Sequence, residues 1–234
     1  FFSINGNYDI SEKLGLTFTA GATSRSDFFD QSGVASTGQI VFGVKRHFNY
    51  ENQRPLQFSQ KQNIVGILGQ ATLDYDDFLF LNVSARTDWV SNLTTENNSK
   101  TYPGVSVSFL PINAFDGTWN DAIGMNYLKL RASYGTSATF PTGYPVVNVI
   151  EQTTQRFVDP ASGGLLTTNQ VDNFRANPDL KPELLEEYEA GIEGRFWDSR
   201  IRFEATYFNR VTNDLIVTEP LYPSTAFSFT QSNV

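Results

Sequence analysis

Residues 78–90 read FLFLNVSARTDWV, and this stretch decides the fold. Apolar residues occupy one set of alternate positions: Leu79, Leu81, Val83, Ala85 and Trp89. Polar or charged residues stand between them: Asn82, Ser84, Arg86 and Asp88. A period of two is that of a β-strand, in which successive side chains point to opposite faces. The stretch therefore predicts a strand with one apolar face and one polar face.

The same alternation recurs on both sides of short polar turns. Residues 63–75 precede the pair Asp76-Asp77, and residues 78–90 follow it, so the two strands are expected to form a hairpin. A second hairpin joins residues 183–197 to residues 200–218. Further strands with the same pattern are predicted near residues 1–9, 14–23, 101–111, 126–137 and 225–234. The predicted fold class is all-β and antiparallel.

The connections between these strands alternate sharply in length. Short connections lie at 10–13, 76–77 and 198–199, and long ones lie at 24–62, 91–100, 138–182 and from 219 onward. With the strands placed as above, the tight turns share one rim and the long loops share the other. Outer-membrane barrels have short periplasmic turns and long extracellular loops. Residues 1–234 are therefore predicted to be one portion of an antiparallel transmembrane β-barrel.

Three segments leave the arrangement open. The 112–125 connection is long for the tight-turn rim, and residues 116–123 within it are compatible with a short helix. In the 24–62 loop, the alternation of Ile40, Phe42 and Val44 fits either a hairpin within the loop or two further wall strands. The chain starts at Phe1 without a signal peptide, and its last strand stops without a turn, so we expect a fragment of a longer protein.

Composition excludes some classes of protein and permits a barrel. The 17 basic residues are scattered and the net charge is −8, which argues against a nucleic-acid partner. No window approaches the roughly 18 consecutive apolar residues that a membrane-spanning helix needs. The mean hydropathy of −0.30 suits a barrel, because only alternate residues of its strands meet lipid.

The positions of the basic residues favour a membrane wall. A Lys or Arg facing lipid near the bilayer midplane costs about 2–4 kcal/mol. In the predicted register, the basic residues of the strands fall opposite the apolar stripe: Arg86, Lys129, Arg131, Arg202 and Arg210. The alternative is a soluble or surface-exposed β-sandwich binding module, for example a carbohydrate-binding one, whose solvated face alternates similarly. Strands of 12 or more residues favour the barrel.

Few residues offer catalytic or metal-binding chemistry. The chain has one His and no Cys, so we predict no enzymatic activity, cofactor or metal site, and His47 is interpreted as a loop residue. Four carboxylates cluster in the sequence, and they suit a Ca²⁺ site or a glycosidase pair: Glu183, Glu186, Glu187 and Glu189. On a strand, however, Glu187, Glu189 and Glu193 share the polar face, where Arg195 and Arg202 are in reach as partners.

Several motifs resemble a known family when they are taken in order. Residues 177–183 read NPDLKPE, residues 187–193 read EYEAGIE, and residues 205–216 read ATYFNRVTNDLI. These resemble TonB-dependent transporters. Residues 85–88 (ARTD), 102–108 (YPGVSVS) and 128–135 (LKLRASYG) narrow the resemblance to the SusC/RagA branch, and together the motifs cover residues 63–234.

The resemblance implies a location, a function and partners. Members of the family lie in the cell outer membrane and import nutrients, here of the glycan or peptide class. The partners implied are the remainder of the barrel and its plug, the TonB complex through an N-terminal region, a SusD-like surface lipoprotein and the lipid bilayer. The signal peptide, the plug and the closing C-terminal strand are expected to lie outside residues 1–234.

Substrate contact is expected from the long loop at 138–182. Aromatic faces stack on sugar rings or pack against peptide side chains, and the candidates are Tyr144, Phe157, Phe174 and Arg175. The alternative, which is the commoner role of such residues, is that they pack the loop against itself. Trp89 and Trp197 stand near strand ends, where they fit an interfacial aromatic girdle.

Overall fold

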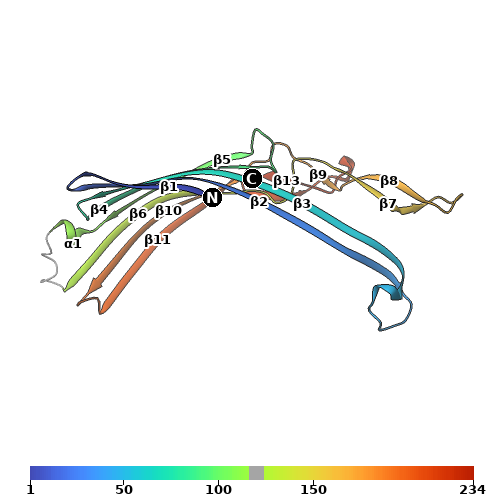
Figure 1. Ribbon diagram of the computed structural model, residues 1–234, viewed down its shortest axis with the longest axis horizontal. Coiled ribbons are helices and arrows are strands. Elements are labelled where there is room, and N and C mark those ends of the chain that lie inside the picture. The colour runs from blue at the N-terminus through green and yellow to red at the C-terminus, as the bar shows by residue number, and fades with distance from the viewer. Residues whose placement is uncertain (116–123) are drawn as a thin grey trace.

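One curved antiparallel sheet of eight strands forms the main body of the protein (Figure 1). The computed structural model describes residues 1–115 and 124–234, without the side chains of residues 151 and 153–157. The strands follow chain order except at the last two positions, where β10 and β11 join the edge of β6. The eight strands are β1 (Phe2–Ser11), β2 (Leu14–Gln39), β3 (Tyr50–Tyr75), β4 (Leu79–Val90), β5 (Ser99–Phe109), β6 (Met125–Thr139), β10 (Glu183–Phe196) and β11 (Ile201–Asn213).

Tight turns close the hairpins at one rim of this sheet (Figure 1). Asp76 and Asp77 join β3 to β4 with φ angles of 51° and 57°, and Trp197, Asp198 and Ser199 join β10 to β11 with φ angles of 50–64°. Asp tolerates this left-handed region better than most residues that carry a Cβ, which suits the Asp residues read in both turns from the sequence. The two predicted hairpins are confirmed in register, with Tyr75 opposite Leu79 and Phe196 opposite Ile201.

The long 24–62 segment is a continuation of two wall strands. β2 and β3 have 26 residues each and pair without a break from Leu14 and Tyr75 to Thr37 and Asn52. The paired segments 24–39 and 50–63 project past the ends of β1 and β4, and we call them the arm (Figure 1). The arm ends in a short 3₁₀ turn at His47–Asn49. Of the two arrangements left open, the hairpin is the one observed.

The residues that suggested this hairpin are not in its strands. Ile40, Phe42 and Val44 lie in the tip of the arm, outside the ranges of β2 and β3. Asn49 holds the tip together, since its side-chain amide donates to the carbonyl oxygens of Val41 and Val44 at 2.7 and 2.9 Å. The alternation of the three apolar residues is therefore a feature of a compact turn.

The last predicted wall strand, at residues 225–234, is wrong. β13 (Phe229–Asn233) pairs with β12 (Ile216–Pro220) and with β9 (Phe174–Arg175), away from the eight-stranded sheet. The separation arises at Asp214, whose φ of 56° ends β11, and at Leu215, which exchanges two backbone hydrogen bonds with Val234. The strand predicted at 200–218 is divided at the same point.

The loop at 138–182 contains more regular structure than its Pro and Gly content indicates. β7 (Ile150–Val158) and β8 (Leu165–Val171) form a separate hairpin that extends away from the tight turns, on the same side of the sheet as the arm (Figure 1). Short helical turns occur elsewhere, α1 at Pro111–Ala114 and a 3₁₀ turn at Pro223–Thr225. The helix suggested for residues 116–123 lies outside the described residues.

Candidate functional site

The two faces of the wall sheet differ in chemistry and in exposure. The register places Leu81, Val83 and Val107 on one face, and each of them is exposed. Asn82, Ser84 and Arg86 of the same strand β4 lie on the opposite face and are less exposed. A water-soluble sheet buries its apolar face and exposes its polar face. In this wall the apolar face is the more exposed of the two.

The basic residues obey the predicted register. The pairings place all five of them on the polar face, which is the inner face of the wall: Arg86, Lys129, Arg131, Arg202 and Arg210. Exposed aromatic residues lie at both rims, with Trp89 on the outer face beside the long loops and Trp197 in a tight turn. Their role in a membrane girdle stays a prediction.

Arg131 organises the inner face between β6 and β11. Its guanidinium Nε lies 3.2 Å from the Glu189 carboxylate, and its Nη2 lies 3.0 Å from Glu204 Oε1. The same Nη2 donates to Thr206 Oγ1 at 2.7 Å. To reach β11, the Arg131 side chain crosses the strand between at Gly191, where the register places no side chain in its path.

Two further glutamates of the predicted cluster, Glu187 and Glu183, and the nearby Glu193 also have basic or backbone partners. Glu187 pairs with Arg210 at 2.5 Å, and Glu193 pairs with Arg195 at 2.9 Å. Glu183 accepts a hydrogen bond from the Ile216 amide at 2.8 Å. Pairing with Arg195 was predicted, whereas the partner of Glu187 comes from the far end of β11. These contacts support the structural interpretation of the cluster.

A second charged group lies near the looped rim. Arg86 Nη2 is 2.7 Å from Asp88 Oδ1, and the Asp88 side chain is only 7% exposed. The Tyr102 hydroxyl donates to Asp88, and Arg86 Nη2 donates to Thr23 Oγ1 at 3.0 Å. Arg86 therefore reaches β2 across β3, at the position of Gly66. Each of the two arginines ties together three or more strands of the wall.

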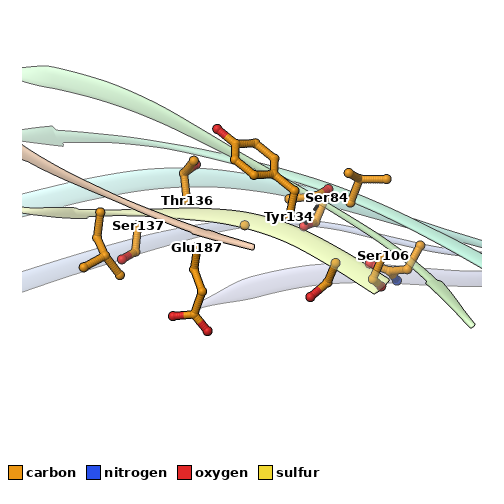
Figure 2. Close-up of a pocket in the computed structure, with 12 residues that line it drawn as sticks. Ser84, Ser106, Tyr134, Thr136, Ser137 and Glu187 are labelled. Carbon is orange, nitrogen blue, oxygen red and sulfur yellow. Dashed lines mark hydrogen bonds between the residues drawn. The ribbon is translucent and has the colours of Figure 1, made fainter. Parts of the chain in front are cut away.

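Small polar residues cover the middle of the inner face. A shallow hollow of about 360 Å³ is lined there by residues of β4, β5, β6 and β10, among them Ser84, Ser106 and Glu187. In Figure 2, Tyr134 and Thr136 point to one side of the sheet and Glu187 points to the other, as the register requires. Hydroxyl groups and short side chains give this part of the wall a polar, uncrowded surface.

The loops above the rim pack around a compact apolar core. Leu180 is fully buried, and the buried residues Val90, Leu93 and Val146 surround it. Asn177 donates from Nδ2 to the Gln231 carbonyl at 2.8 Å. The NPDLKPE stretch that marked the family in the sequence therefore anchors three external loops to one another, a role that its letters alone did not reveal.

The predicted substrate-contact residues Tyr144 and Phe174 have different partners. The Tyr144 hydroxyl donates to the Lys61 carbonyl at 2.6 Å, which ties its loop to the arm. Phe174 packs against Phe229 with ring centroids 5.7 Å apart, and Arg175 next to it is exposed. Phe157 of β7 pairs with Leu166 of β8, and the Phe157 side chain lies outside the described part. Their role in substrate contact stays a prediction.

Sequence reasoning missed an aromatic pair on the arm. The rings of Phe29 and Phe58 lie 6.1 Å apart on the arm surface that continues the inner face of the wall. The two residues are 56% and 53% exposed. The adjacent pair Phe28 and Phe29 was the available signal, because neighbouring strand residues point to opposite faces and one of the two had to face inward.

No helix in the described part of the chain is long and apolar enough to span a membrane.

The strands of the wall carry the evidence for its class. The sheet is curved, apolar and exposed outside, polar inside, tightly turned at one rim and looped at the other, which defines the wall of an outer-membrane β-barrel. The chain belongs to the TonB-dependent receptor family, since residues 2–234 match the family described as "TonB dependent receptor-like, beta-barrel". The predicted family, fold and outer-membrane location are confirmed.

Two curated relatives come from Formosa agariphila. "TonB-dependent receptor P26" is 26% identical over 172 residues, which are 73% of this chain and 17% of the relative. "TonB-dependent receptor P3" is 25% identical over 170 residues, which are 72% of this chain and 16% of that protein. The chain thus spans about a sixth of the length of these relatives.

Solved structures share the fold. The RagAB peptide transporter superposes with a TM-score of 0.80 over 99% of this chain and 25% of that chain, at 19% identity. The siderophore receptor PirA from Acinetobacter baumannii gives a TM-score of 0.56 over 99% and 30% of the two chains, at 17% identity. Both likenesses show that the wall shares the barrel fold. The β-sandwich alternative is not favoured.

Proposed function

We propose that this chain supplies wall and external loops to an energy-coupled importer of the outer membrane. The polar inner face carries the proposal, because a wall that is apolar outside and lined with ion pairs and hydroxyl groups inside encloses a passage for polar cargo. The plug, the TonB-contacting segment and the rest of the barrel belong to other parts of the same protein. A SusD-like surface lipoprotein is the proposed partner at the looped rim.

The cargo is a nutrient of the glycan or peptide class. The fold likeness to the RagAB peptide transporter supports the peptide class. The proposed contact residues are those of the long external loop: Tyr144, Phe157, Phe174 and Arg175. Among these, Arg175 is an exposed residue of β9, in the small sheet of β9, β12 and β13.

Uptake by whole cells tests the proposal. Cells in which the complete gene is deleted are compared with wild-type cells for uptake of a labelled peptide mixture and a labelled oligosaccharide mixture. Loss of uptake of one mixture, and its restoration by the intact gene, is expected. An uncoupler that collapses the proton-motive force should abolish the same uptake. Uptake that is unchanged by both the deletion and the uncoupler would contradict an energy-coupled importer.

A further inference from the structure

The arm part of β3, before Asn63 in the chain, has no pairing with β4 within the described residues. One edge of this part of β3 is therefore open. The Ser91 amide donates to the Asn63 carbonyl at 3.0 Å, and the Asn63 amide donates to Ser91 Oγ at 3.0 Å. In an antiparallel strand, both backbone groups of every second residue point to the same side. The pairing with β2 is regular here, so the backbone groups at 61, 59 and 57 point to the edge that Asn63 faces.

Almost none of this edge is used. Tyr144 binds the Lys61 carbonyl, and Pro55, which has no N–H, interrupts the edge four residues before Ser59. Across the residues that the structure describes, nothing bonds to the Lys61 amide or to the edge-facing backbone groups of Ser59 and Gln57. A short run of alternating donors and acceptors therefore stands open between Lys61 and Gln57.

Apolar and amide side chains adjoin the open edge on the inner surface. Phe58 lies between two edge positions and contacts Phe29, and both rings are about half exposed. Gln31 and Gln60 share this surface. Farther along the arm, a hollow of about 560 Å³ is lined by residues 51–54 together with Ala35, Thr37 and Leu165 of β8. The edge thus runs from the rim of the wall toward a space between the two external hairpins.

We propose that the β3 edge from Lys61 to Gln57 binds an extended peptide by strand addition, with one peptide side chain on the Phe29–Phe58 pair. Strand addition uses main-chain hydrogen bonds for affinity and pockets beside alternate residues for selection. An edge of five residues is about 17 Å long, which suits a short peptide. A glycan lacks the matching alternation of donors and acceptors. The inference rests on the proposed import function and names its substrate class.

A single backbone donor gives the sharpest test. Ser59→Pro removes an N–H that points away from β2, so the arm keeps its own ladder, and Pro is tolerated at strand edges, as Pro55 shows. Ser59→Ala is the matched control, because it also removes the hydroxyl but keeps the N–H. The complete transporter with its surface partner is titrated with a fluorescein-labelled octapeptide, Thr-Val-Thr-Phe-Thr-Val-Thr-Lys, and with the same peptide N-methylated at alternate residues.

We expect Ser59→Pro and N-methylation each to weaken binding about fivefold to tenfold, and Ser59→Ala to leave it within twofold. Equal binding by the Pro and Ala variants would overturn the inference. So would protection of the amides of residues 57–61 from hydrogen exchange by the surface partner alone, without change on peptide addition. A transporter that binds the peptide as expected but carries none into cells contradicts the proposed function instead, and leaves the binding site standing.

Discussion

Arg131 on β6 passes directly over Gly191 on β10, and a Cβ atom at residue 191 would lie 2.5 Å from the Arg131 Nε atom. The absence of a side chain at this position opens the path by which Arg131 reaches Glu204 and Thr206 on β11. Gly191 does not have a positive φ, so its backbone conformation does not require glycine. The close approach of the Arg131 side chain to its backbone explains the glycine instead.

Gly191→Val is therefore expected to displace Arg131 and break its contacts to β11. We expect a loss of about 1–3 kcal/mol in the free energy of unfolding, from overpacking and from charges left without partners. Gly135→Val is the matched control, because residue 135 lies on the same face and no atom lies within 4 Å of a Cβ built there. Urea unfolding of the complete barrel in detergent measures both, and equal losses would contradict this role for Gly191.

Two Arg–Asp ion pairs with the same spacing in the sequence test how strongly burial affects the contribution of an ion pair to stability. Arg86 and Asp88 are two residues apart on the inner face, and Arg25 and Asp27 are two residues apart on the arm. The Asp88 side chain is 7% exposed and that of Asp27 is 46% exposed. Asp88→Asn should cost about 1–3 kcal/mol, because it leaves Arg86 beside a neutral amide in a confined site.

The exposed pair should matter much less. Solvent and salt screen Arg25 and Asp27, so Asp27→Asn is expected to change the free energy of unfolding by less than about 1 kcal/mol. Raising the salt concentration should reduce the small effect of Asp27→Asn further and leave that of Asp88→Asn largely unchanged. A larger effect at Asp27 than at Asp88 would mean that the inner face is as well solvated as the arm.

Much of the wall was predictable from the sequence because lipid and the polar interior impose opposite demands on neighbouring residues. The Leu79–Trp89 alternation therefore predicted both the strand and the direction of Arg86. On the arm, both faces meet water, and the period-two pattern is lost around Phe28 and Phe29, so the sequence left this segment open. The position of β13 depends on a left-handed Asp214 and on hydrogen bonds between residues about 19 to 54 positions apart, which no local pattern reveals.

The β7–β8 turn should respond to acid. The Ser162 hydroxyl and the Ala161 amide both donate to the Asp159 carboxylate. These hydrogen bonds hold the pKa of that carboxyl below its ordinary value, and the bond from Ser162 has the larger effect. A lowered pKa in the folded turn means that the contacts stabilise it above the ordinary pKa of about 3.9 and are lost as the pH falls through the folded value. Hydrogen exchange of residues 159–164, corrected for its intrinsic pH dependence, should show less protection below about pH 4. In Ser162→Ala, the loss should begin at a higher pH.

The outward direction of Val83 can be tested by placing a charge on each face of β4. Val83→Arg puts a guanidinium on the apolar outer face near the middle of the strand, where a charge facing lipid costs about 2–4 kcal/mol. Ser84→Arg places the same group one residue later on the polar inner face, beside the hollow of Figure 2, where water and carboxylates accommodate it.

Refolding of the complete barrel into lipid vesicles, followed by its heat-dependent migration on gels, compares the two variants. We expect Val83→Arg to reduce the folded fraction and Ser84→Arg to change it little, because a one-residue shift along a strand exchanges lipid for the polar interior. The reverse order would place lipid on the face that carries Arg86 and Arg131, and would invert the assignment of inside and outside for the whole wall.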